Sequence, residues 1–147
     1  MNNTYRKSSH SLYKIEIHLV WITKYRYKVL KGPIAVRTRD LIRRICSEEN
    51  VEIISGVVSQ DHVHLLVSID PTISISKLMK YLKGKTSRKL QIEFPELSKK
   101  YWGQHFWARG YFAVSTGNVS SKMIEEYISH HFEKKEDKDD PFKIEMN

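Results

Sequence analysis

The sequence has little of what several other classes of protein depend on. Its single cysteine, Cys46, excludes an intramolecular disulfide and a cysteine-rich zinc site. No apolar run approaches the roughly 18 residues of a membrane span and no signal-peptide pattern is present, so we expect a cytoplasmic protein without a membrane partner. The 17 acidic residues are outnumbered by 25 lysines and arginines, giving a net charge of +8. This excess of positive charge favours an anionic partner, with nucleic acid as the leading candidate. The alternative is a basic protein whose charge serves only its solubility.

The order of apolar and polar residues predicts one α+β domain. Alternation with a period of two predicts strands over 13–22, 51–59, 60–69 and 107–115, and helical spacing predicts helices over 33–50, 74–91 and 121–132. The order β-α-β-β-α-β-α fits a ferredoxin-like or RRM-like fold, with a four-stranded antiparallel sheet and two helices on one face. We assign 1–132 to this domain, and 133–147, which is charged and poor in apolar residues, to a flexible tail.

Two histidines of one predicted strand are candidate metal ligands. His62 and His64 share one face of the strand, because side chains alternate between the two faces of a sheet. Two imidazoles so placed can bind one divalent metal ion. The motif His-x-His is a weak signal, and ordinary half-buried histidines are the more frequent explanation for it.

The last predicted helix supplies candidates for a third ligand and a nucleophile. Tyr127 and His131 lie one turn apart on a continuous face. If this face docks over the histidine side of the sheet, His131 completes a three-ligand site and Tyr127 stands beside the metal. The alternative is that Tyr127 anchors the core and that His131 is a helix-end residue favoured by the helix dipole. His130 points about 100° away and is the weaker candidate.

Tyrosine is a plausible nucleophile for a phosphodiester. Attack would leave a covalent phosphotyrosine that retains transfer potential, so that a strand could be rejoined without a nucleotide cofactor. A bound divalent cation would polarise a phosphate oxygen. Histidine and oxygen ligands suit Mg²⁺, Mn²⁺ or Zn²⁺, of which we expect Mg²⁺ or Mn²⁺ first.

Two basic stretches are candidate DNA-binding surfaces. In the first, Lys24 and Arg26 alternate with Tyr25 and Tyr27, on which bases of a single strand could stack. The second is the predicted helix 74–91, whose lysines and arginines are interrupted by no acidic residue: Lys77, Lys80, Lys83, Lys85, Arg88 and Lys89. A strand-end packing cluster and a solvated helix face are the respective alternatives.

Several separate segments carry a resemblance to a known family. They are HLVWITKYR at 18–26, DHVHLL at 61–66, KGKTSR at 83–88, FWARGYF at 106–112 with STG at 115–117, and EYI at 126–128. Together they resemble the IS200/IS605 family of single-strand DNA transposases, which are HUH enzymes with one tyrosine nucleophile. The resemblance covers nearly all of the chain, from about residue 13 to residue 132.

The resemblance implies a function and its residues. His62 and His64 would be the HUH metal ligands, and Tyr127 the nucleophile that cleaves and rejoins single-stranded DNA through a 5′-phosphotyrosine. It also implies a homodimer whose sheets join across subunits, and recognition of DNA hairpins at the ends of a mobile element.

One position departs from the family pattern. The pattern has glutamine as a metal ligand four residues after the tyrosine, whereas this chain has His131. Imidazole can ligate in its place, so we expect activity with an altered metal preference. The alternatives are an inactive or domesticated relative, an RRM-like binding module without catalysis, and a metal-dependent hydrolase in which water attacks and Tyr127 only packs. The lack of an aromatic-rich pattern in the strands counts against the binding module.

Overall fold

The computed structural model describes residues 5–101, 105–115 and 121–136, with the backbone alone for 121 and 130–136. The elements follow one another as β1 (Arg6–Lys7), β2 (Leu12–Tyr13), β3 (Ile15–Ile22), the 3₁₀ turn η1 (Lys24–Arg26), α1 (Gly32–Glu48), β4 (Glu52–Val58), β5 (His62–Ile69), α2 (Ile75–Glu93), α3 (Pro95–Lys100), β6 (Phe112–Ser115) and α4 (Ser121–Glu136). This succession contains the predicted order β-α-β-β-α-β-α, and the ferredoxin-like prediction is confirmed.

The centre of the main sheet is the pair β3 and β5. The strands are ordered β4-β5-β3-β6 and each neighbouring pair is antiparallel. In the β3–β5 register, Val20 lies opposite His64 and Ile22 lies opposite His62. β4 and β5 form the predicted hairpin around the turn at 59–61. The histidine strand is therefore held between two partners rather than at an edge.

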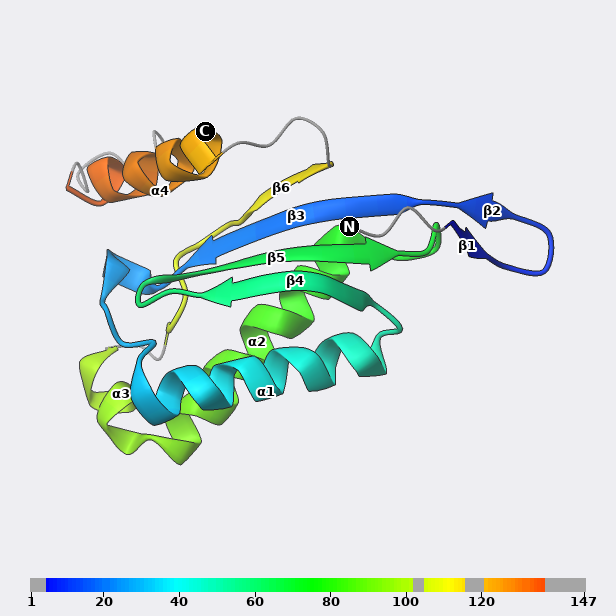
Figure 1. The fold of residues 1–147 in the computed structure, drawn as a ribbon. Helices are drawn as coiled ribbons and strands as arrows, with labels where there is room; N and C mark the ends of the chain where they lie inside the picture. The colour runs from blue at the N-terminus through cyan, green and yellow to red at the C-terminus, as the bar shows by residue number, and fades with distance from the viewer. Residues whose placement is uncertain (1–4, 102–104, 116–120, 137–147) are drawn as a thin grey trace.

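Helices cover both faces of this sheet, as Figure 1 shows: α1, α2 and α3 lie on one side and α4 lies on the other. On the first side, odd-numbered residues of β3 and β5 pack against the helices in the larger core, which includes Leu19, Trp21, Val63, Leu65, Val67, Leu41, Ile42, Ile45, Leu78, Met79 and Leu82. On the second side, Val20 and Ile22 pack against Ile124 and Ile128 in a smaller cluster. The sheet is thus the middle layer between two apolar contacts of unequal size.

A short N-terminal hairpin and a short helix were not predicted from the sequence. β1 and β2 pair as a small hairpin, and Arg6 Nη1 fixes it to β5 by donating to the carbonyl oxygen of Ser68 at 2.9 Å. Pro95, expected to close the second helical region, instead begins α3. Proline suits the start of α3, because its missing N–H is no loss in the first turn of a helix.

The strand predicted over 107–115 is shorter than expected. Trp107 makes only an isolated bridge with Thr23, and continuous pairing with β3 begins at Phe112. Between them the carbonyl oxygens of Ala108 and Gly110 accept hydrogen bonds from Lys83 Nζ, both at 2.8 Å. These bonds draw the chain towards α2 and away from the sheet.

The last helix is longer than expected. α4 runs to Glu136, so the first four residues of the predicted tail continue the helix, and 137–147 lie outside the described residues. Within the described part of the chain, no helix is both long and apolar enough to cross a membrane.

Candidate active site

His62 and His64 lie on the face of β5 that is turned away from the larger core. Their neighbours Val63 and Leu65 are buried at 0% and 3% exposure, which directs both histidines to the face shared with α4. Both imidazoles are half-buried. The predicted alternation of this strand is therefore confirmed.

A third histidine belongs to the same face. His18 of β3 approaches from the neighbouring strand, and its Nδ1 lies 2.9 Å from Nε2 of His64. Burial lowers the pKa of both rings, and for His64 the nearby charges of His18 and His62 lower it further. The sequence interpretation missed His18 as a site residue. The signal was present, because His18 has the same parity in β3 as Val20 and Ile22, but it acquires meaning only once β3 and β5 are neighbours.

α4 packs on β3, the strand next to the one that carries His62 and His64. Ile124 and Ile128 pack on Val20 and Ile22, and these two residues are the register partners of His64 and His62. Adjacent strands lie about 4.8 Å apart, so the helix rests one strand away from the two imidazoles. The helix therefore docks on the histidine side of the sheet, as the sequence interpretation required.

Tyr127 faces the sheet from α4. Its ring centroid lies 5.3 Å from that of Phe112 in β6, and its hydroxyl oxygen is buried. This burial raises the pKa of Tyr127 well above its usual value, which keeps the phenol protonated. In this arrangement Tyr127 packs against β6 as a core anchor, and its role as a nucleophile beside the metal stays a prediction.

The described side chains supply only part of the predicted metal site. Those residues contain no cluster of three or more histidine, cysteine, aspartate or glutamate side chains able to hold a metal ion. His62 and His64 supply two imidazole donors of the kind that divalent transition metals accept. The predicted third ligand, His131, lies within α4, but its side chain is outside the described residues.

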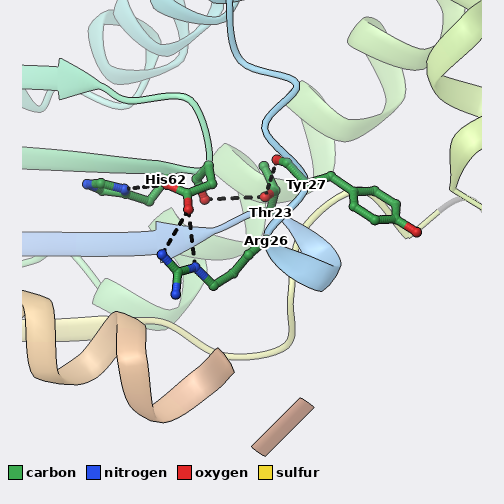
Figure 2. Close-up of polar contacts among 5 residues, drawn as sticks. Thr23, Arg26, Tyr27 and His62 are labelled. Atoms are coloured by element: carbon green, nitrogen blue, oxygen red, sulfur yellow. Dashed lines mark hydrogen bonds and ion pairs between the residues drawn. The ribbon is translucent and has the colours of Figure 1, made fainter. Parts of the chain in front are cut away.

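A carboxylate next to the motif ties it to η1. Asp61 is only 8% exposed, and its side chain contacts both Arg26 and His62. Figure 2 shows Arg26 and His62 on two sides of this carboxylate, with Thr23 and Tyr27 beside them. The sequence interpretation placed Arg26 on a DNA-binding surface, whereas its guanidinium group is engaged with Asp61.

The rest of the stretch 24–28 is more open. Tyr25 is 39% exposed, and Lys24 Nζ lies 5.3 Å from the centre of its ring. Tyr27 stacks obliquely between Tyr25 and the buried Tyr101, with centroid distances of 5.3 Å to each. Tyr25 is therefore the exposed edge of an aromatic cluster whose inner members are Tyr27 and Tyr101.

The basic residues of α2 divide into two groups. Lys80, Lys85 and Arg88 are exposed, whereas Lys83 is turned towards the carbonyls of Ala108 and Gly110. Burial lowers the pKa of Lys83 to about 8. α2 packs on the face of the sheet opposite the histidines, so its exposed charges and the histidine pair lie on different sides of the sheet (Figure 1).

Relatives of known identity resemble this chain over most of its length. It is 34% identical over 129 residues to the ISDra2 transposase TnpA of Deinococcus radiodurans, covering 88% of this chain and 92% of that protein. It is 36% identical over 125 residues to the transposase for insertion sequence element IS200 of Salmonella typhimurium, covering 85% of this chain and 82% of that protein.

Solved structures show the same fold. A crystal structure described as a transposase from Deinococcus radiodurans matches with a TM-score of 0.79 and 33% identity, covering 84% of this chain and 95% of the other. A REP-associated tyrosine transposase bound to a REP hairpin matches with a TM-score of 0.55 and 14% identity, covering 84% and 68%, which shows a shared fold. Residues 11–131 match the family described as "Transposase IS200 like". On this match and the identities above, the chain belongs to the IS200-like transposases.

Proposed function

We propose that this transposase cleaves and rejoins single-stranded DNA at the ends of an insertion sequence, with Tyr127 as nucleophile. The observation that carries the proposal is the seating of the tyrosine helix: Ile124 and Ile128 rest on the register partners of His64 and His62. Membership of the IS200-like family makes DNA strand transfer the expected reaction.

In the proposed step the Tyr127 Oη attacks a backbone phosphorus. The phosphorus–O3′ bond breaks, the 3′ oxygen leaves as a hydroxyl, and the phenolic proton passes to solvent. The 5′-phosphate stays on the tyrosine, and a 3′ hydroxyl can later displace it without a nucleotide cofactor. Because the hydroxyl of Tyr127 is buried and protonated, it must first become accessible to DNA, which requires α4 to shift on the sheet.

His62 and His64 fit a divalent metal ion, with His131 as the proposed third ligand. Two half-buried imidazoles on one strand face supply suitable donors, and a bound Mg²⁺ or Mn²⁺ would polarise the phosphate and offset charge that develops on it. The protein's own contribution is to hold these two rings beside α4.

DNA hairpins are the proposed substrate, bound by a homodimer. The structural relative in complex with a REP hairpin supports this substrate class, as does the net charge of +8. The proposed contacts are the exposed Tyr25 and the partly exposed Lys24, together with Lys80, Lys85 and Arg88 of α2. Since α2 and the histidines lie on different faces, a bound strand would pass around an edge of the sheet to reach Tyr127.

Capture of a covalent protein–DNA adduct tests this proposal. Wild-type protein is incubated with Mg²⁺ or Mn²⁺ and single-stranded element ends labelled at either terminus, and then run on a denaturing gel. We expect the 3′-labelled fragment to migrate with the protein and the 5′-labelled fragment to end in a free hydroxyl. Cleavage without an adduct would instead indicate a hydrolase in which water attacks, and binding without cleavage would indicate an inactive or domesticated relative.

A further inference from the structure

Asp61 lies where the turn after β4 meets the first residue of β5. Its backbone carbonyl oxygen accepts a hydrogen bond from the backbone N–H of Thr23 at 3.0 Å, and the hydroxyl oxygen of Thr23 lies 3.3 Å from it. Thr23 is fully buried. The position of Asp61 is therefore fixed from the end of β3, independently of what its side chain does.

The carboxylate of Asp61 makes contacts on two sides. Oδ2 accepts a hydrogen bond from Arg26 Nε at 3.1 Å and forms an ion pair with Arg26 Nη2 at 3.1 Å, and Oδ1 lies 2.9 Å from Nδ1 of His62. An ionised carboxylate has only acceptor atoms, so Nδ1 of His62 must be the donor. In neutral His62 the lone pair is then on Nε2, the ring nitrogen that points away from Asp61 (Figure 2).

The surroundings keep Asp61 in its ionised, accepting form. The guanidinium group of Arg26 forms an ion pair with the carboxylate at 3.1 Å, which is the contact expected of an ionised carboxyl. The side chains of Asp61 and Arg26 are 12% and 29% exposed, so this ion pair is partly shielded from solvent. Loss of Arg26 would leave a nearly buried carboxylate without its cation.

Arg26 reaches Asp61 from a strained turn. Tyr25 and Arg26 both have left-handed backbone conformations, with φ of 63° and 53°. Such conformations are unfavourable for residues other than glycine and persist where surrounding contacts impose them. Here Thr23 holds the turn, because its carbonyl accepts from Arg26 N at 3.0 Å and its hydroxyl donates to Tyr27 O at 2.8 Å.

The second histidine of the motif has a different kind of partner. Nε2 of His64 faces Nδ1 of His18, and either imidazole can carry the shared proton. Only His62 therefore has its tautomer fixed by a charged group. A carboxylate that binds one ring nitrogen of a histidine is the usual support of a metal-ligating imidazole.

We infer that Asp61, held in place by Arg26, is a positioning residue that keeps the proton of His62 on Nδ1 and presents Nε2 to the metal. The inference rests on the proposed function and deepens it, since it names the group that orients one of the two motif ligands. Arg26 then acts inside the site, through Asp61, rather than on a DNA phosphate.

The tautomer of His62 can be read in the metal-free protein. At about pH 8 an ordinary histidine is neutral, and long-range ¹H–¹⁵N correlation spectra distinguish Nδ1–H from Nε2–H. We expect wild-type His62 to be Nδ1–H and Asp61→Asn to shift towards Nε2–H. Asp70→Asn is the matched control, because Asp70 accepts hydrogen bonds from Thr72 just beyond the other end of β5 and should leave His62 unchanged.

Calorimetric titration with Mn²⁺ supplies the second measurement. Asp61→Asn should bind Mn²⁺ about 10–100-fold more weakly than wild type, the usual effect of removing such a support. Arg26→Lys keeps a positive charge beside Asp61 but replaces a two-point contact with a single point charge. This variant should therefore keep the Nδ1–H tautomer of His62 and weaken Mn²⁺ binding less than Asp61→Asn does. Asp70→Asn should bind as wild type does.

Each outcome decides for or against the inference. An Nε2–H tautomer in wild-type His62 overturns it, even if Asp61→Asn fails to fold. Unchanged Mn²⁺ affinity in Asp61→Asn also overturns it, and so does lost affinity with an unchanged tautomer, which would make Asp61 a ligand. Failure of the wild type to bind Mn²⁺ overturns the metal role in both proposals. Metal binding with the expected tautomer but without DNA cleavage overturns the proposed function alone.

Discussion

Among individual residues, Lys83 of α2 differs most from what its sequence context indicates. It belongs to an unbroken basic series, yet its ammonium group is bound to the carbonyl oxygens of Ala108 and Gly110. A lysine so engaged connects α2 to the segment that leads into β6. We therefore expect Lys83 to contribute more to stability than to DNA binding.

Replacement of Lys83 by methionine tests this role. The aliphatic stem is kept and both hydrogen bonds are lost, so the free energy of unfolding should fall by about 1–3 kcal/mol at neutral pH. Urea denaturation measures the change. Lys80→Met, at an exposed position of the same helix, is the matched control and should stay within about 0.5 kcal/mol of wild type. Equal effects of the two substitutions would contradict the assignment.

The lowered pKa of Lys83 also predicts a pH dependence. Its folded-state pKa is about 8 and its ordinary value is 10.5, so between these values the unfolded chain retains a proton that the folded protein has released. The contribution of Lys83 to stability should therefore rise as pH increases from about 8 to 10.5. A neutral amine still has two N–H donors for the two carbonyls. The rise should be missing in Lys83→Met, and identical pH profiles would refute the shift.

His131 remains a prediction of a metal ligand. His131→Gln should retain cleavage and shift the preference towards Mg²⁺, because an amide oxygen is a harder donor than imidazole. His131→Ala should lose most cleavage, with His62→Ala and His64→Ala at least as severe. Cleavage titrated against Mg²⁺, Mn²⁺ and Zn²⁺ measures this. If His131→Ala cleaves like wild type with every metal, the third ligand is another residue.

At the scale of elements, periodicity predicted what depends on one strand or helix alone. The two faces of β3 and β5 followed from their alternation, and the inward face of α4 followed from the spacing of Ile124, Tyr127 and Ile128. Contacts that depend on two elements escaped prediction. The approach of His18 to His64 requires the β3–β5 register, which no single strand encodes.

The contact between Arg26 and Asp61 escaped prediction for a different reason. It depends on left-handed backbone at Tyr25 and Arg26, and left-handed turns are normally marked by glycine or asparagine. Here the hydrogen bonds of Thr23 impose the conformation, and they involve residues that are brought together only in the folded sheet. α3 was missed because proline is compatible with both the end and the start of a helix.

The two apolar clusters predict that α4 can loosen without unfolding the sheet. Ile124→Ala removes one of the few side chains that hold α4 on β3, at a cost of about 2 kcal/mol or more. Hydrogen exchange of α4 amides should therefore quicken at least about tenfold, with β3 and β5 nearly unchanged. Ile92→Ala, at a position 66% exposed on α2, is the control. Uniform loss of protection across the sheet would show that the layers unfold as one.

For the whole molecule, the charge distribution predicts salt-dependent binding of single-stranded or hairpin DNA in preference to paired duplex. Each phosphate contact contributes about 0.7 to the slope of log affinity against log salt for a single strand. The triple variant Lys80→Ala, Lys85→Ala, Arg88→Ala should therefore reduce the slope by about 2. Lys83→Ala should leave it almost unchanged, because Lys83 is already bound to carbonyl oxygens. An unchanged slope in the triple variant would move the DNA path to another surface.

The central claim is that Tyr127 is the nucleophile of strand transfer, and mapping of the covalent adduct tests it most directly. Phenylalanine at this position keeps the ring packed on Phe112 and removes only the hydroxyl. Wild type and the exposed-tyrosine control Tyr5→Phe should yield an adduct whose phosphorylated peptide contains Tyr127, identified by mass spectrometry. Tyr127→Phe should yield none while binding hairpin DNA almost as wild type does. An adduct that persists in Tyr127→Phe, or a phosphorylated peptide from another part of the chain, would contradict the claim.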